Sequence, residues 1–155
     1  AVRTNGSTMG YPNPVFTDDE HFVETTIVHG GFQSGPIFYD NTVASVSEVT
    51  ANTNNLASGS DWTVGSPETL VLWFYGDPNN PDTEQMYVKV DDVEVTYDGD
   101  LTQTEWVEWS IDLAALGTDL SNVSTLSIGF KKIGATGGSG VVFVDDIYLK
   151  AALEE

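Results

Sequence analysis

The chain has 155 residues and no cysteine, so its simplest organisation is one domain without disulfide bonds. Its 24 acidic and 5 basic residues give a formal net charge of −19, which repels nucleic acid and anionic membranes. No run of about 18 apolar residues is present and the first residues lack a signal-peptide pattern, so we expect a soluble chain, compatible with the mature part of an exported protein. The charge indicates either a solvated acidic surface or a dedicated cation site.

The first 20 residues are rich in turn formers, among them Asn5-Gly6 and Asn13-Pro14. They predict an irregular arm over residues 1–20, with Tyr11 and Phe16 as anchors on the surface. We expect a single domain over residues 21–151, followed by a short tail over 152–155.

Short segments rich in β-branched and aromatic residues follow, separated by Gly, Pro, Asn and Asp, and they predict strands. The expected strands are Phe22–Val28, Pro36–Asp40, Ala44–Thr50, Thr69–Tyr75, Gln85–Val90, Val93–Tyr97, Glu105–Leu113, Leu126–Phe130 and Val141–Leu149. With no convincing long helix, this pattern predicts an all-β fold, an antiparallel β-sandwich.

The segment Thr69–Val90 organises this prediction. We expect its two strands to form one long hairpin around a solvated loop, Asp77–Glu84, whose carboxylates and amides lack the spacing of an EF-hand. Because side chains alternate along a strand, every second residue faces the core. The predicted core side chains are Leu70, Leu72, Phe74, Val107, Trp109, Ile111, Leu126, Ile128 and Phe130, with Trp62 also in the core.

The opposite faces of these strands carry aromatic and polar side chains. Aromatic rings stack on the apolar faces of sugars, while amides and charged groups bond the hydroxyls. The candidate ligand-binding residues are Trp73, Tyr75, Tyr87, Lys89, Trp106 and Gln85. The alternative is that these rings pack beneath the N-terminal arm or the loop Asn52–Ser60.

Three segments resemble a known family: HGGFQS (His29–Ser34), EWVEWSIDL (Glu105–Leu113) and VVFVDDIYL (Val141–Leu149). Together they resemble galactose-binding-like β-sandwich domains, chiefly the carbohydrate-binding modules of secreted bacterial glycoside hydrolases. The resemblance implies a sandwich of jelly-roll type that binds a polysaccharide or oligosaccharide and is secreted, hence extracellular.

In that family the first aspartate of the closing Asp-Asp pair often helps to bind a structural calcium, and Asp145 is the matching residue. Alternation with Phe143, Ile147 and Leu149 predicts that Asp145 points inward, which is costly unless the carboxylate is paired or bound to metal. Calcium would resolve that cost, with Glu24 and Glu48 as companion ligands and Asp40 as a weaker candidate. The alternative is an ordinary hydrogen-bonded carboxylate at a strand end.

Such domains usually begin with an apolar-acidic strand, which residues 1–15 do not resemble. This difference raises the hypothesis that the first strand is missing and that another segment or subunit fills its place, giving self-association. The histidines at 21 and 29 have no third metal ligand at suitable spacing, and His29-Gly30-Gly31 is interpreted as a tight turn.

The sequence therefore predicts a non-catalytic carbohydrate-binding module of an exported bacterial protein, with a structural calcium. The alternative from another class is a structural or assembly domain of an extracellular filament or surface layer. A glycan-active enzyme ranks third, because it needs two carboxylates facing each other across a cleft and none of the acidic residues has a distinctive setting.

Overall fold

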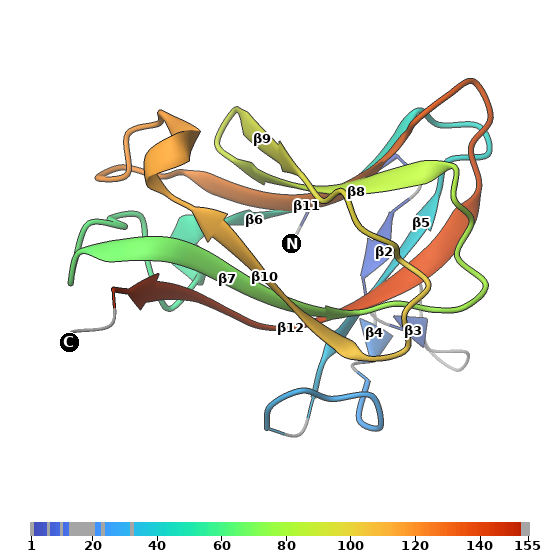
Figure 1. The fold of residues 1–155 in the computed structure, drawn as a ribbon, viewed down its shortest axis with the longest axis horizontal. Helices are drawn as coiled ribbons and strands as arrows, with labels where there is room; N and C mark the ends of the chain where they lie inside the picture. Colours follow the sequence, from blue (N-terminus) through green and yellow to red (C-terminus); the bar gives the residue numbers. More distant parts are fainter. Residues whose placement is uncertain are drawn as a thin grey trace.

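The structure is a computed structural model, and it describes residues 2–5, 7–9, 11–12, 21–22, 24–31 and 33–152. These residues form two five-stranded antiparallel sheets stacked face to face, together with a small two-stranded sheet (Figure 1). The predicted all-β sandwich is confirmed.

One layer, called sheet A, has the strand order β1-β6-β11-β8-β9. Its strands are β1 (Val2–Asn5), β6 (Val46–Asn52), β11 (Thr125–Lys132), β8 (Glu84–Val90) and β9 (Val93–Thr96). The other layer, sheet B, has the order β10-β7-β12-β5-β2. Its strands are β10 (Trp106–Asp112), β7 (Pro67–Tyr75), β12 (Ser139–Ala151), β5 (Gly35–Asp40) and β2 (Thr8–Met9).

The remaining elements are short. Strands β3 (Tyr11–Pro12) and β4 (His21–Phe22) pair with each other, and η1 (Thr53–Asn55) and η2 (Ala114–Leu116) are single 3-10 turns. In the described part of the chain, no helix is long and apolar enough to cross a membrane.

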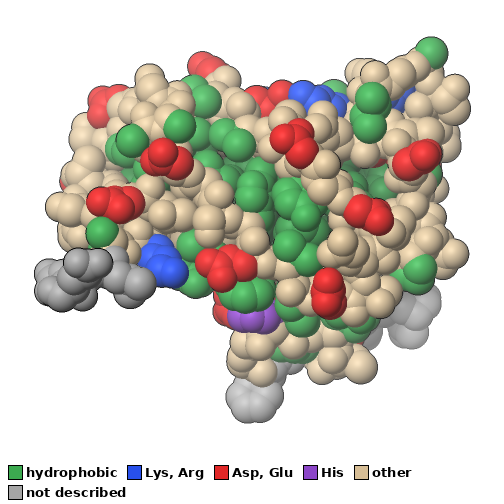
Figure 2. Space-filling view, in the orientation of Figure 1, with side chains coloured by type: hydrophobic (Ala, Val, Ile, Leu, Met, Phe, Trp, Pro, Cys, Tyr) green, Lys and Arg blue, Asp and Glu red, His purple; other side chains and the backbone are tan. Residues whose placement is uncertain are grey.

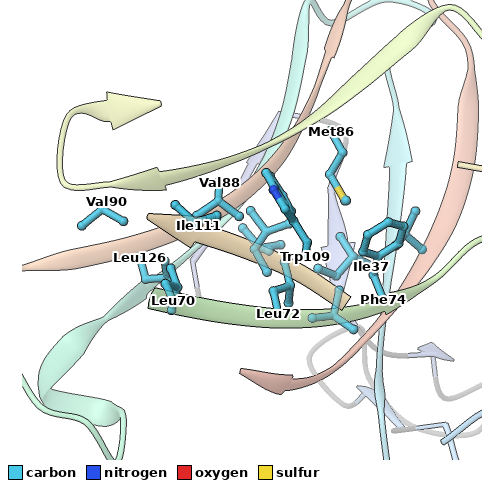
Figure 3. Packing of buried hydrophobic residues seen from close by; sticks show 14 of the residues in the cluster. Ile37, Leu70, Leu72, Phe74, Met86, Val88, Val90, Trp109, Ile111 and Leu126 are labelled. Atoms are coloured by element: carbon cyan, nitrogen blue, oxygen red, sulfur yellow. The ribbon is translucent and has the colours of Figure 1, made fainter. Parts of the chain in front are cut away.

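The core lies between the inner faces of the two sheets (Figure 3). Of the nine side chains predicted to meet there, eight are at most 9% exposed, and Val107 is partly buried against them. Trp62 is also buried in this core, as predicted. Burying a side chain the size of leucine stabilises the fold by about 1.5–3 kcal/mol, so these inward residues hold the two sheets together.

The predicted hairpin between β7 and β8 is wrong. β7 lies between β10 and β12 in sheet B, whereas β8 lies between β11 and β9 in sheet A. The connecting residues 76–83 therefore cross from one layer to the other. Alternation along each strand is the same for a hairpin and for a crossover, so the sequence pattern could not distinguish them.

The predicted irregular N-terminal arm is only partly correct. Val2–Asn5 form β1, which pairs antiparallel with β6 and makes the edge of sheet A. Thr8–Met9 form β2, which pairs with β5 at the edge of sheet B. A first strand is therefore present, and the self-association inferred from a missing strand loses that support. The anchors predicted at Tyr11 and Phe16 lie outside the described side chains.

The predicted strand Phe22–Val28 is also wrong. After β4 the described chain makes only a single bridge, between Glu24 and Ser34, and residues 25–27 bend away. The Glu24 carboxylate accepts hydrogen bonds from the backbone N–H groups of Thr25, Thr26 and Ile27. These local bonds compete with strand pairing and turn the chain into a loop.

Candidate functional site

The six predicted ligand-binding residues lie on opposite outer faces of the sandwich. This separation follows from the crossover, because an outward residue on β7 and an outward residue on β8 belong to different sheets. Trp73, Tyr75 and Trp106 lie on the outer face of sheet B, and Gln85, Tyr87 and Lys89 lie on the outer face of sheet A. Each outer face thus carries three of the six predicted residues.

The outer face of sheet B carries a row of aromatic rings across three neighbouring strands. Trp106 on β10 is opposite Tyr75 on β7, which is opposite Phe143 on β12. The Tyr75 and Trp106 ring centroids are 5.5 Å apart with planes inclined by 60°, and those of Tyr75 and Phe143 are 6.1 Å apart. Phe143 is buried, whereas Tyr75 and Trp106 are half-buried and remain partly accessible.

The next row on this face centres on Trp73. Register places Glu108 of β10 on one side of Trp73 and Asp145 of β12 on the other. Trp73 is half-buried and Glu108 is exposed. An indole with a carboxylate beside it combines a stacking surface with hydrogen-bond acceptors, the two features that a sugar requires.

His29 completes the cluster, and the sequence analysis missed it. Its imidazole stacks on Trp73, with ring centroids 3.9 Å apart and planes inclined by 18°. Its centroid also lies 5.5 Å from that of Trp106, at 61°. Among the described residues, the segment that covers Trp73 is therefore the loop 25–31, for which the sequence predicted the end of a strand and the tight turn His29-Gly30-Gly31.

Two aspartates of β12 hold this loop in place. Asp145 Oδ2 accepts hydrogen bonds from the backbone N–H groups of His29, at 3.0 Å, and Gly30, at 3.1 Å. Asp146 Oδ2 lies 2.6 Å from His29 Nδ1. The sequence features that could have pointed to this contact are the Asp-Asp motif and the His-Gly turn, which lie more than 100 residues apart. The order of the strands in the sheet brings them together.

Asp145 does not point into the core, contrary to the prediction. It faces outward in register with Trp73, while its neighbour Val144 packs inward. A β-bulge between Asp145 and Tyr148, with Asp146 at a φ of 46°, shifts the alternation. Leu149 therefore points inward although Asp145 does not.

The candidate calcium ligands do not form a shared site. Asp145 already accepts hydrogen bonds from three backbone N–H groups, of His29, Gly30 and Asp146. Glu48 lies on the opposite outer face, and Glu24 bonds to its own loop. Among the described residues no group of three or more His, Cys, Asp or Glu side chains could hold a metal ion. These three residues do not fit one calcium ion, and calcium binding stays a prediction.

The outer face of sheet A is a polar network around Glu48. The Glu48 carboxylate accepts a hydrogen bond from the Tyr87 hydroxyl and one from Lys89 Nζ at 3.3 Å. Burial opposes ionisation of Glu48, but these hydrogen bonds and the Lys89 charge outweigh it and lower the carboxyl pKa. Tyr87 is only 2% exposed and lies over Gly129, where a Cβ would collide with its ring. Tyr87 is thus a packing residue rather than a free platform.

Solved structures that share this fold include three carbohydrate-binding modules. The family 11 carbohydrate-binding module from Clostridium thermocellum, in complex with a β-1,3-1,4-mixed-linked tetrasaccharide, is 13% identical, with a TM-score of 0.62 over 99% of this chain and 89% of that chain. A family 30 carbohydrate-binding module is 18% identical, with a TM-score of 0.57 over 97% of this chain and 84% of that chain. A family 28 module specific for non-crystalline cellulose is 13% identical, with a TM-score of 0.54 over 84% of this chain and 81% of that chain.

These likenesses show that the chain has the β-sandwich fold of carbohydrate-binding modules. No protein-family model matches the sequence, and no curated protein matches it.

Proposed function

We propose that this chain is a non-catalytic carbohydrate-binding module that binds a glycan on the outer face of sheet B. The observation that carries the proposal is the cluster of Trp106, Tyr75, Trp73 and His29, set beside exposed Glu108 on a sandwich of the same fold as known modules. Partly accessible rings supply the stacking surface, and neighbouring carboxylates accept sugar hydroxyl groups.

The charge of the chain favours a neutral glycan. Acidic side chains are spread over the face shown in Figure 2, and the formal net charge is −19. A field of this sign repels uronate or sulfate groups, whereas a neutral sugar experiences no such repulsion. Binding should therefore depend little on salt, because no charge on the ligand is available to be screened.

The tilt of the rings favours single glycan chains over a flat crystalline surface. The Trp106 ring is inclined by 60° to Tyr75 and by 61° to His29, so these rings cannot all lie against one plane. A single chain can rotate its successive sugar rings to follow such a surface. Two of the structurally similar modules support the same preference for single glycan chains, since one is described in complex with a tetrasaccharide and another as specific for non-crystalline cellulose.

We also propose that the chain belongs to an exported protein. A polysaccharide of this kind is too large to enter a cell, so a module that binds it acts outside. The absence of cysteine is compatible with that location, and the acidic composition keeps the chain soluble.

The test compares alanine variants on the two outer faces. Trp106→Ala should weaken binding of the β-1,3-1,4-mixed-linked tetrasaccharide by about 1–3 kcal/mol, which is about 5- to 150-fold, by analogy with stacking on planar ligands. Trp73→Ala should weaken binding less, because His29 already covers one of its faces. Lys89→Ala on sheet A is the matched control and should leave affinity unchanged. Calorimetric titration measures all three, and thermal melting checks that each variant folds.

Two results would overturn the proposal. One is a folded Trp106→Ala variant that binds as tightly as the wild type. The other is a wild type that binds no glycan across neutral polysaccharides. In the second case, size-exclusion chromatography showing concentration-dependent assembly would favour the structural or assembly domain instead.

A further inference from the structure

His29 brings to the aromatic cluster a ring that carries two nitrogen atoms on its edge. It is an exposed residue, and 29% of its side-chain surface is accessible to solvent. One face of the imidazole lies on Trp73, and the carboxylate of Asp146 lies beside Nδ1. The accessible surface therefore belongs to the other face of the ring and to the rest of its edge, which includes Nε2.

The carboxylate of Asp146 decides which of the two nitrogens carries the proton. Asp146 Oδ2 lies 2.6 Å from His29 Nδ1, and a carboxylate can only accept a hydrogen bond. Nδ1 must therefore carry a hydrogen and donate it. In the neutral imidazole the other nitrogen, Nε2, then holds a lone pair and is an acceptor. Among the described residues, none forms a hydrogen bond with Nε2.

An irregularity of β12 turns Asp146 toward this ring. Asp145 faces outward in register with Trp73, so strict alternation would point Asp146 into the core. The β-bulge after Asp145 and the φ of 46° at Asp146 break the alternation, and both carboxylates reach the loop 25–31. Bulges are common beside functional sites, where they re-aim a side chain in this way.

Gly30 leaves the space that the Asp146 carboxylate occupies. A Cβ atom built on Gly30 would lie 2.4 Å from Asp146 Oδ2, the same oxygen that faces His29 Nδ1. A larger residue at position 30 would therefore displace this oxygen from the imidazole. The His-Gly turn and the Asp-Asp motif thus act together in orienting the ring.

The loop does not depend on this contact to stay in place. Asp145 Oδ2 already accepts hydrogen bonds from the backbone N–H groups of His29 and Gly30. The Asp146 contact adds little stability, because both side chains are partly exposed and water screens their interaction. Its main effect is on the orientation and the tautomer of the imidazole, which the partner of one ring nitrogen sets for the other.

The imidazole borders the ring that is most open to a ligand on this face. The centroids of His29 and Trp106 are 5.5 Å apart, with planes inclined by 61°. A sugar that stacks on Trp106 carries its hydroxyl groups around the rim of its own ring, beside the neighbouring imidazole. Glu108, two residues along β10 from Trp106, is exposed and offers a second acceptor.

We infer that His29 binds the glycan directly. Nε2 accepts a hydrogen bond from a hydroxyl group of the sugar that stacks on Trp106, and Asp146 is the residue that positions the imidazole. The inference rests on the proposed function, and it adds that the ligand presents a free hydroxyl group at this place. A sugar methylated there has no hydrogen to donate and leaves Nε2 unpaired.

His29→Asn and His29→Gln test the two nitrogens separately. The asparagine amide reaches the position of Nδ1 and leaves nothing at Nε2, whereas the glutamine amide reaches the position of Nε2. The probe is the β-1,3-1,4-mixed-linked tetrasaccharide, titrated calorimetrically into the full chain. His29→Asn should weaken binding by about 2- to 12-fold, the loss of one hydrogen bond, and His29→Gln should recover most of the affinity. Lys150→Ala, on the exposed end of β12, is the control and should bind like the wild type.

Nitrogen nuclear magnetic resonance of the imidazole tests the geometry apart from the affinity. In the free protein Nδ1 should give the signal of a protonated nitrogen and Nε2 that of an unprotonated one. The tetrasaccharide should shift the Nε2 signal and leave that of Nδ1 nearly unchanged. In Asp146→Ala the two tautomers should mix, while thermal melting shows that the variant is folded. A purely structural role of His29 would leave the Nε2 signal unchanged on titration.

Three results would overturn the inference: a folded His29→Asn variant that binds as tightly as the wild type, equal losses in His29→Asn and His29→Gln, or a free protein in which Nε2 carries the proton. The second result would assign the effect to the stacked ring instead of to Nε2. Binding that is lost in Trp106→Ala but unchanged in His29→Asn would refute the role of His29 and keep the proposed function. A wild type that binds no tetrasaccharide would refute both.

Discussion

The imidazole of His29 lies flat against the indole of Trp73, with ring centroids 3.9 Å apart and planes inclined by 18°. The two residues come from a loop and from a central strand of sheet B, and the contact covers one face of the indole. Trp73 is thus both part of the outer aromatic face and the support on which the loop 25–31 rests.

His29→Ala should uncover Trp73 without unfolding the domain. The imidazole is partly exposed, with 29% of its side-chain surface accessible, so its loss removes little buried area. The expected result is a red shift of tryptophan emission and stronger quenching by acrylamide, because the indole gains water. Lys150→Ala, on the exposed end of β12, serves as the control. Unchanged emission in the folded His29→Ala variant would show that another group covers Trp73.

Asp145→Ala should loosen the loop 25–31. The substitution removes the acceptor of the N–H groups of His29 and Gly30 and leaves both amides without a protein partner. Hydrogen exchange at these two amides should become faster, while exchange in β7 stays slow. Equal exchange rates in the variant and the wild type would mean that the aspartate does not hold the loop.

Calcium binding is tested by melting the wild type and Asp145→Ala with calcium and with a chelator. If Asp145 is a ligand, calcium at about 100 times its dissociation constant adds about 2.7 kcal/mol to the free energy of unfolding of the wild type and nothing to that of the variant. If Asp145 only caps the loop, the variant melts lower than the wild type by the same amount in both conditions. The hydrogen bonds that its carboxylate already accepts lead us to expect the second result.

Glu48 should make stability depend on pH in acid. Its folded pKa lies below the ordinary value of 4.5, so its contribution is present above that value and is lost as the pH falls through the folded pKa. Protonation of the other carboxylates also changes stability, because it relieves the charge repulsion within a chain of net charge −19. That effect is the same in the wild type and in the variant. Between about pH 7 and about pH 3, the melting temperature should therefore fall more for the wild type than for Glu48→Gln. An equal fall in both would remove Glu48 as the cause.

Leu72→Ala should cost about 2–5 kcal/mol of the free energy of unfolding, because this side chain is 1% exposed and packs between the two sheets. Val64→Ala provides the contrast, since Val64 is 75% exposed and its loss should be nearly neutral. Chemical denaturation of both variants gives the two values. A cost below about 1 kcal/mol for Leu72→Ala would contradict the packing of the core.

Local patterns in the sequence determined which residues form strands and which of them share a face. Leu70, Leu72 and Phe74 pack inward and Trp73 and Tyr75 outward, as alternation predicts, because the period of a strand is a property of the backbone. The same reasoning identified the all-β class and the outward position of Trp106. It failed where a local interaction broke the pattern, at the Glu24 turn and at the bulge beside Asp146.

Only the tertiary structure decided which outward residues meet. Strand order is set by packing between segments far apart in the chain, and alternation carries no information about it. That order sent Tyr87 to the face opposite Trp73 and brought His29 to Trp73 through Asp145 and Asp146. It also enclosed the hydroxyl of Tyr39 beside Gly140, a contact between two strands that pair only in the folded sheet.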